Sequence, residues 1–263
     1  TTNNPLATFQ EALSRSPFGT NGNTEYSEIV FLTGNYTITQ ELRQACWQYD
    51  NGSGFRSVSL RGIHRDSVIL DGSAAIYQSG NFIELLGSGI SIKDLTIKLA
   101  SPTDTTHFWA AIDFKSTVNP CNNNHSNNIL IEKILIDGCW DHGININETD
   151  FVLVKNCEVR HTNLININGR NDVNGTFQWG SGIKTRLAND IEIRDCHIHH
   201  CWGEGISTAR TTNVEVHHNK VHDNFSVNIY LDNVIDGQYT HNLCYGTIGN
   251  STYWRGVSPA PGF

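Results

Sequence analysis

The chain has 263 residues and a formal net charge of −8, and only 17% of its residues are charged. This composition excludes a disordered chain, and the acidic balance argues against a protein that binds nucleic acid through the phosphate backbone. Since no apolar run is long enough to cross a bilayer, we expect a folded protein without a membrane span.

The first 25 residues contain the chain's one good helix signal. Pro5 stands at the first turn of a segment in which Leu6, Phe9 and Leu13 fall on one side. We expect a short helix here that covers the N-terminal end of the fold. Short apolar strands follow, at residues 58–60, 68–71, 82–85 and 90–92.

From about residue 131 the chain repeats one unit. The aligned segments cover residues 131–137, 154–160, 193–199, 216–222 and 239–245. Their fourth positions are separated by steps of 23, 39, 23 and 23 residues, and 39 is one repeat plus a 16-residue insertion. A second strand beginning with Gly-Ile or Asn-Ile recurs in each repeat, so each repeat holds three short strands.

Strands this short bury a face only when one repeat stacks on the next. The sequence therefore predicts an all-β fold, a right-handed parallel β-helix of about seven coils of 23 residues plus insertions. We expect one domain over residues 1–263, with a cap at 1–25, coils at 26–258 and an uncapped C-terminal end that favours self-association. Ile183, Ile206 and Ile229 should stack inside one wall.

Another predicted column lies at a bend of the coil. Its members are Cys157, Cys196, Asn219 and Asn242. Stacked amides there can bond one another and the backbone. The two cysteines are close enough in this register for a disulfide, but we expect buried thiols.

Two sequence segments resemble those of a known family: Val-Ile-Leu-Asp-Gly at 68–72 and the end of the repeat at 222–233. Over about residues 26–250 the chain resembles the right-handed parallel β-helix repeat proteins of the pectin-lyase-like superfamily. That superfamily holds polysaccharide lyases, glycoside hydrolases, epimerases, esterases, phage tailspikes and non-catalytic surface proteins, so the resemblance implies the fold and leaves the activity open. It also implies a substrate groove along the sheet of Gly-Ile strands. The motifs of polygalacturonases and mannuronan epimerases are absent.

Outward positions on that sheet suit an acidic polysaccharide as partner. Lys184, with Arg186 and Arg210, could neutralise a uronate carboxylate and remove the adjacent proton, as a β-eliminating lyase requires. The resemblance to β-helix chondroitin and alginate lyases, which use a Lys and Arg pair, implies the same. The alternative interpretation of these residues is a set of surface charge pairs.

A second enzyme hypothesis is a glycoside hydrolase with paired carboxylates, for which Glu204 and Asp232 are the candidates. Either carboxylate could instead belong to a loop or a polar ladder. Substrate binding is assigned to six further residues, namely Tyr230, Asn145, Asn147, His142, Trp179 and Trp202. The two Trp side chains could instead pack against a neighbouring coil. A non-catalytic adhesion or filament-forming module stays open as well.

No cofactor or metal is assigned. Calcium bound by Asp141 or Asp113 remains an option. His199 is expected to lie above His222, beside a second stack that ends in Asp223; such stacks either bind zinc or copper or form a polar ladder, and we expect the ladder. We also expect a secreted or cell-surface protein, glycosylated at some of its seven Asn-x-Ser/Thr sequons, which lie at Asn35, Asn51, Asn124, Asn147, Asn174, Asn224 and Asn250.

Overall fold

The computed structural model describes residues 27–39, 42–43, 48–50, 55–75, 80–85, 89–99, 108–114, 126–164 and 180–248. The predicted N-terminal helix, Trp179 and the end of the last coil lie outside these residues. Within them the chain forms strands and one 3₁₀ turn, Arg65–Ser67. None of the described segments is a helix of the length and apolarity needed to cross a membrane.

The strands form three parallel sheets, which we name A, B and C. Sheet A contains β1 (Ser27–Phe31), β5 (Phe55–Gly62), β8 (Ser91–Lys93), β11 (Ser126–Glu132), β14 (Thr149–Lys155), β17 (Asn189–Arg194), β20 (Thr212–His217) and β23 (Ile235–Thr240), and β4 (Gln48–Asp50) pairs antiparallel with β5. Sheet B contains β2 (Gly34–Thr37), β6 (Val68–Asp71), β9 (Thr96–Lys98), β12 (Leu135–Asp137), β15 (Glu158–Arg160), β18 (His197–His199), β21 (Lys220–His222) and β24 (Leu243–Tyr245). Sheet C contains β3 (Leu42–Arg43), β7 (Ile83–Leu85), β10 (Ala110–Phe114), β13 (His142–Asn147), β16 (Ser181–Arg186), β19 (Glu204–Ala209) and β22 (Ile229–Asp232).

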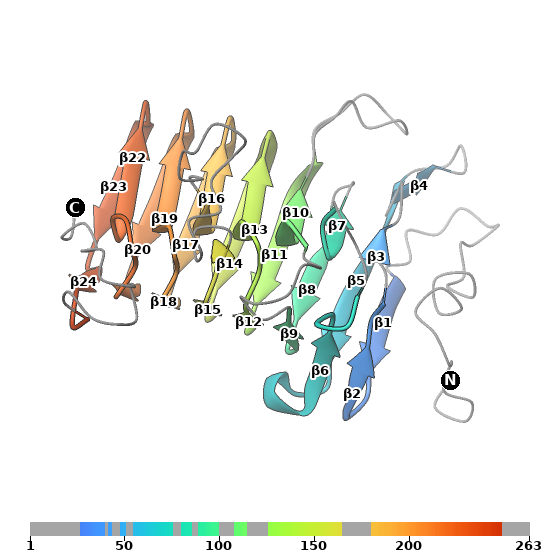
Figure 1. The fold of residues 1–263 in the computed structure, drawn as a ribbon. Helices are drawn as coiled ribbons and strands as arrows, with labels where there is room; N and C mark the ends of the chain where they lie inside the picture. The colour runs from blue at the N-terminus through green and yellow to red at the C-terminus, as the bar shows by residue number, and fades with distance from the viewer. Residues whose placement is uncertain are drawn as a thin grey trace.

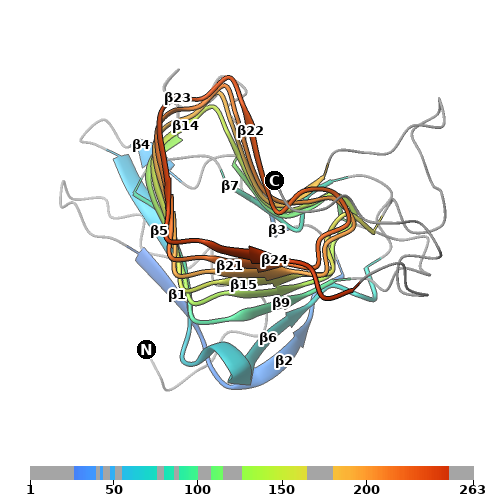
Figure 2. The ribbon, with the colours of Figure 1, turned by 90° about the vertical axis from the view of Figure 1, so that its left-hand side faces the viewer.

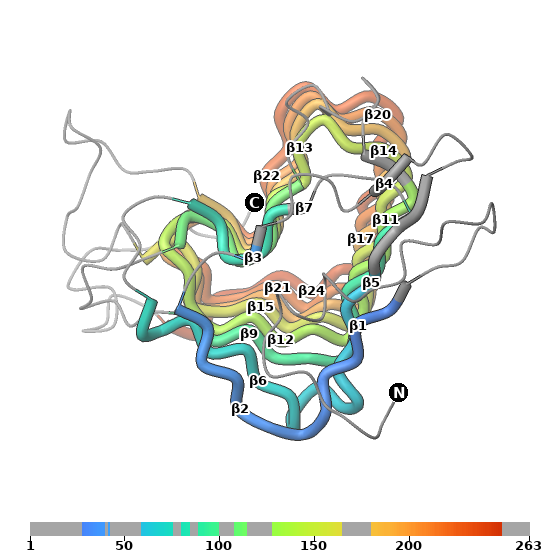
Figure 3. Tube along the Cα trace, turned by 90° about the vertical axis from the view of Figure 1, so that its right-hand side faces the viewer, coloured from blue at the N-terminus to red at the C-terminus, as the bar shows by residue number. Residues whose placement is uncertain are grey.

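The coils stack in chain order along one axis (Figure 1). Figures 2 and 3 look along this axis from its two ends and show the three sheets as three walls around a common interior. Each coil passes from sheet C to sheet A to sheet B and then returns to sheet C. The predicted parallel β-helix is confirmed.

The register of the coils matches the predicted columns. Ile183 pairs with Ile206, and Ile206 pairs with Ile229, in adjacent strands of sheet C. All three side chains are buried in the core. The 39-residue coil between Val159 and Ile198 keeps these strands as closely paired as the 23-residue coils do, so the insertion leaves the stack intact.

Residues other than glycine make the bends of each coil. In the coil that begins with β13, the backbone is left-handed at Glu148, Phe151, Asn156 and His161, with φ between 50° and 55°. The next two coils repeat this pattern at equivalent positions, which are Leu187, Asp190, Asp195 and His200, followed by Arg210, Asn213, His218 and Asp223. Non-glycine residues rarely adopt this conformation, and Asn, Asp and His adopt it most readily. The recurrence shows that the bends are part of the repeat.

The predicted column at the bend between sheets A and B is a hydrogen-bond ladder. The amide oxygen of Asn219 accepts from the backbone N–H of Cys196 at 2.9 Å, and that of Asn242 accepts from the N–H of Asn219 at 3.0 Å. Cys157 and Cys196 continue the column as free, buried thiols. A second ladder bond joins the Asn224 amide oxygen to the N–H of Cys201, so the Asn224 sequon is buried in the fold.

Candidate active site on sheet C

A central row of side chains runs along the outer face of sheet C. The strand register aligns Glu84, Asp113, Asn145, Lys184, Ser207 and Tyr230 in that order. Second in the row, Asp113 accepts hydrogen bonds from the amides of Asn145 and Asn81, both at 2.7 Å. Each of its two carboxylate oxygens is thus engaged by an amide.

In β13, β16 and β19 the regular in–out alternation of side chains is interrupted near the start of the strand. One further residue of each strand therefore lies on the outer face of sheet C. Both residues of the Gly-Ile pairs point inward: a Cβ on Gly143 would lie 2.5 Å from the core side chain of Val159, and a Cβ on Gly205 would lie 2.5 Å from that of Val221. The residue before each glycine therefore points outward. Period-two alternation alone assigns the opposite orientation to these residues, which are His142, Ser181 and Glu204.

Glu204 is a buried carboxyl group at the start of β19, with 4% of its surface exposed. It accepts a hydrogen bond from the Ser181 hydroxyl at 3.2 Å. Burial raises the pKa of Glu204 above its ordinary value, while hydrogen bonds from Ser207 and Ser181 and the charge of Lys184 partly oppose the rise. Glu204 thus has the environment of a carboxyl group that keeps its proton longer than usual.

Asp141 and His142 form a second group two coils away. The backbone N–H of Ser181 donates to His142 Nδ1 at 3.1 Å, so the ring proton belongs on Nε2, which lies 3.3 Å from Asp141 Oδ2. Burial lowers the pKa of His142 to about 4, and the positive charge of Lys184 adds to this against the opposing effect of Asp141. The ring is therefore neutral near pH 7 and orients Asp141, whose buried Oδ1 has no hydrogen-bond partner among the described residues.

Lys184 stands between these two groups in the central row and influences the pKa of both His142 and Glu204. Among the described residues no carboxylate lies within 4.0 Å of its ammonium group. The two predicted arginine partners lie further along the strands. Arg186 is exposed two residues beyond Lys184 on β16 and donates to Asn147 at 3.3 Å. Arg210 is exposed at the left-handed bend between β19 and β20, directly after Ala209, which is the register partner of Arg186.

The predicted carboxylate pair, Glu204 and Asp232, does not meet. Asp232 pairs with Ala209 at the far end of β19, five residues along the strand from Glu204. Five residues correspond to about 16 Å, well beyond the roughly 5–9.5 Å that separates paired glycosidase carboxylates. Asp141 lies nearer to Glu204 than Asp232 does. The strand register aligns Asp141 with residue 180 in the next coil and with residue 203 in the coil after that, and residue 203 directly precedes Glu204.

The aromatic side chains divide into a buried and an exposed set. Trp202 is buried and stacks on Phe225 with ring centroids 5.6 Å apart, in a small cluster that includes Trp140, so packing accounts for Trp202. Tyr230 is 42% exposed in the central row. Trp109, 37% exposed, was not predicted; its carbonyl accepts from the N–H groups of Asp141 and of the next residue, one coil below them. The alignment of Phe-Trp-Ala at 108–110 with Trp-Asp-His at 140–142 is the sequence signal for it.

Comparisons with known proteins agree with this architecture. A family model described as a right-handed β-helix region matches residues 163–256. The chain is a right-handed parallel β-helix protein. A comparison with curated protein sequences gives no match.

Several solved structures are similar to this chain at low identity. The enzymatically active domain of tailspike protein 2 from bacteriophage CBA120 is 11% identical, with a TM-score of 0.47, over 89% of this chain and 33% of that chain. The full-length tailspike is 12% identical, with a TM-score of 0.49, over 90% and 37%. The A-module of an Azotobacter vinelandii mannuronan C-5 epimerase is 11% identical, with a TM-score of 0.44, over 82% and 67%. This β-helix spans about a third of the tailspike chains, and such identities are too low to transfer site residues to it.

Proposed function

We propose that the outer face of sheet C binds an acidic polysaccharide and hydrolyses a glycosidic bond, with Glu204 as the proton donor and Asp141 as the base that activates water. The observation that carries the proposal is the contrast between the two carboxyl groups. Burial favours the protonated form of Glu204, whereas Asp141 lies beside a neutral histidine, with Oδ2 at 3.3 Å from His142 Nε2, and its Oδ1 has no hydrogen-bond partner among the described residues. Such a contrast is how one site provides both an acid and a base.

The spacing of the two groups supports an inverting hydrolase. Their backbones are two coils apart, which corresponds to about 9–10 Å, near the upper end of the roughly 6.5–9.5 Å between the carboxyl groups of inverting enzymes.

The remaining residues of the face suit a charged sugar chain. Lys184, which has no ion-pair partner among the described residues, is available for a sugar carboxylate. Trp109 and Tyr230 offer exposed rings one coil beyond each end of the Asp141 to Glu204 span. These two residues are four coil steps apart, about 19 Å along the axis, which leaves room for several sugar units.

A specific observation keeps β-elimination as the second candidate. Lys184 lies beside both His142 and Glu204, as a cation that neutralises a uronate would. The product separates the two reactions, because elimination creates an ultraviolet-absorbing unsaturated sugar, whereas hydrolysis creates reducing ends alone.

The test is a screen of uronate-containing and other acidic polysaccharides for reducing ends and unsaturated product. Glu204→Gln and Asp141→Asn should each lower kcat at least about 100-fold while binding of the polysaccharide is retained. Glu215→Gln, an exposed glutamate on the outer face of sheet A, is the matched control and should leave kcat unchanged. Absence of both binding and cleavage across the screen would overturn the proposal.

We propose a secreted or cell-surface location, because acidic polysaccharides of this kind are found outside the cell.

We infer as well that the last described coil supports self-association through its exposed apolar side chains, which are Leu231, Ile235 and Leu243.

A further inference from the structure

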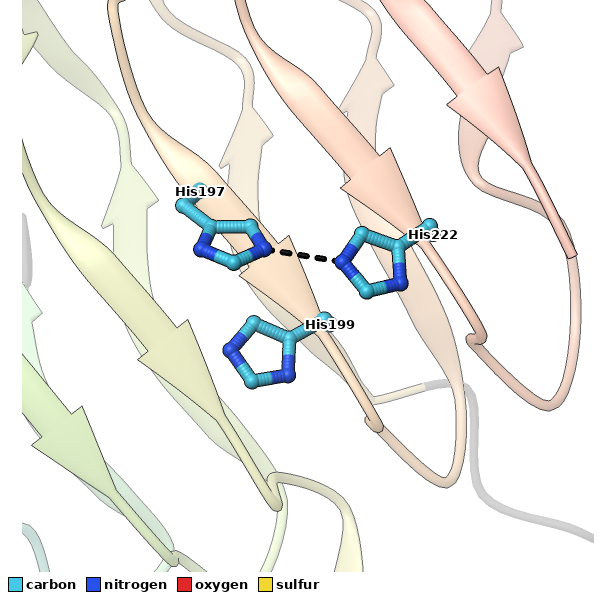
Figure 4. A group of neighbouring side chains, drawn as sticks. All are labelled: His197, His199 and His222. Carbon is cyan, nitrogen blue, oxygen red and sulfur yellow. Dashed lines mark hydrogen bonds between the residues drawn. The ribbon is translucent and has the colours of Figure 1, made fainter. Parts of the chain in front are cut away.

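A histidine cluster lies on the outer face of sheet B, on a different wall of the solenoid from the candidate active site (Figure 2). His197 and His199 are two residues apart on β18, and His222 pairs with His199 from the adjacent strand β21. One ring nitrogen from each of the three lies within 4.8 Å of the other two. Figure 4 shows the three rings side by side on the two strands.

The orientation of His222 is set by a buried carboxylate. His222 Nδ1 lies 2.7 Å from Asp223 Oδ2, and the Asp223 carboxylate also accepts from the backbone N–H groups of Thr247 and Ile248. Burial alone would raise the pKa of Asp223, but these hydrogen bonds, including the one from His222, hold it well below its usual range. His222 Nδ1 therefore faces the Asp223 carboxylate, and Nε2 is the ring nitrogen that faces away from it.

His222 Nε2 faces His197. It lies 2.8 Å from His197 Nε2 (Figure 4). One of these two nitrogens carries the proton that makes the contact favourable. A metal ion that binds both nitrogens replaces that proton, which moves to solvent or to another ring nitrogen.

His199 presents the third lone pair. Its Nδ1 lies 2.6 Å from Nδ1 of His200, and its buried Nε2 has no hydrogen-bond partner among the described residues. The nearest carboxylate oxygen to this Nε2 is that of Glu158, at 3.6 Å, which is too long for a hydrogen bond. A buried nitrogen left without a partner costs free energy unless something binds it.

Two of the three rings have a lowered pKa. Burial lowers the pKa of His199 to about 3, with further lowering from His197, His200 and His222. Burial also lowers the pKa of His197, and the neighbouring His222 and Lys220 add to it. Neutral imidazole is the form that binds metals.

We propose that His197, His199 and His222 bind one divalent transition-metal ion, with zinc as the reference, and that Asp223 orients His222 for this role. Zinc bound to imidazole nitrogens at roughly 2.0–2.1 Å in a tetrahedron holds those nitrogens about 3.3–3.4 Å apart. To reach this arrangement the 2.8 Å contact between His197 and His222 must open by about half an ångström, and the longer separations in the cluster, up to 4.8 Å, must close. Water or Glu158 would take the fourth position.

His199 stacks on His222 with ring centroids 5.3 Å apart, as expected of a polar ladder, and the carboxylate beside His222 is an additional feature that suits a metal ligand. Metal-binding histidines usually donate their second N–H to a carboxylate or carbonyl, as His222 does to Asp223. A polar ladder has no need to leave Nε2 of His199 buried and unpaired. All three ligands are imidazoles, a set that suits zinc, copper and nickel and does not suit calcium or magnesium.

The test is a calorimetric titration of the chelator-treated protein with zinc. We expect one ion per chain and an increase in Tm on binding. His199→Gln and His222→Gln should each lower the affinity at least about 100-fold, and Asp223→Asn should lower it about 10- to 100-fold. The matched control is His241→Gln, because His241 stacks on His218 at 4.9 Å on an exposed bend and should not contribute to binding.

X-ray absorption of the zinc-loaded, unmodified protein decides the question even where a variant fails to fold. Three imidazoles around zinc would support the site. Zinc surrounded by fewer than three imidazoles, no binding of zinc, or unchanged affinity in folded His199→Gln and His222→Gln would overturn it.

Discussion

The left-handed residues at the bends are where single side chains decide the stability of a coil. Phe151 has a φ of 54° and is 55% exposed. Its register neighbours are Asn128 and Asp190, and further along the axis the same position is Asn213. Those neighbours are the residue types that tolerate this backbone, whereas a large side chain there costs about 1–2 kcal/mol.

We therefore expect Phe151→Asn to stabilise the protein. The substitution relieves backbone strain and loses little packing, so the free energy of unfolding should rise by about 1 kcal/mol. Denaturant unfolding measures it. Phe151→Leu, which keeps a bulky side chain at the same φ, is the control and should give no gain. A loss of stability in Phe151→Asn would show that the ring packs more than its exposure indicates.

A single charge, that of Lys184, affects the protonation of Glu204. The lysine charge lowers the pKa of Glu204 and so opposes the rise caused by burial. A proton donor loses activity as the pH rises through its pKa. In Lys184→Met the pKa of Glu204 should be higher, and the alkaline limb of the kcat profile should move to higher pH. Lys220→Met, on the outer face of sheet B, should leave the profile unchanged. A shift of the limb to lower pH would contradict Glu204 as the acid.

The ladder between sheets A and B acts at the scale of the strand. Asn219 accepts from Cys196 N–H, and its amide donates to the carbonyl of Ile193 at 2.9 Å and to Asn242 at 3.0 Å. Cys196 fills the equivalent position one coil earlier: its Sγ accepts from Cys157 N–H and lies 3.1 Å from the carbonyl of Arg194. One position therefore accepts either side chain.

This equivalence predicts a graded pair of variants. Asn219→Ala leaves a buried N–H and carbonyl without partners and should cost about 2–4 kcal/mol of unfolding free energy. Asn219→Cys should cost less than half as much, because a thiol serves the same position at Cys157 and Cys196. Thermal or denaturant unfolding of the two variants checks it. Equal losses would show that the amide is required at this position.

The sequence predicts the strands of this fold well and the orientation of some side chains poorly. Columns such as Ile183, Ile206 and Ile229 follow from the repeat, because stacking preserves equivalent positions. The outward orientation of Glu204 does not follow from period-two alternation, because Gly205 and Ile206 both point inward. Trp109 was not predicted, because the residues just before β10 have the composition of a loop. The candidate site was thus found in part, without its Asp141 to Glu204 pairing.

At the scale of the whole molecule, the last described coil differs from the rest. Ile235 and Leu243 are 61% and 58% exposed, whereas apolar side chains at many positions of the other coils are buried. Exposed apolar side chains beside the end strands of a sheet favour pairing with another chain.

We expect the protein to self-associate through this coil. Its weight-average mass in sedimentation equilibrium should exceed that of a monomer and rise with concentration. Ile235→Lys combined with Leu243→Glu should return it to a monomer, because charges at these positions oppose contact. The same pair of charges at Val30 and Ile63, exposed residues near the first described strands, is the control. A monomer at all concentrations would contradict the expectation.

Coil length and coil stacking are independent in this molecule. Thirty-nine residues separate Val159 from Ile198 and 23 separate Ile198 from Val221, yet all three stay in register. Additional chain between β15 and β16 thus leaves the rungs on either side as they are. The inserted segment between these two strands can therefore vary in length and sequence without changing the register of the coils. A β-helix of this kind can acquire new ligand preferences by changing such a segment while the sheets stay the same.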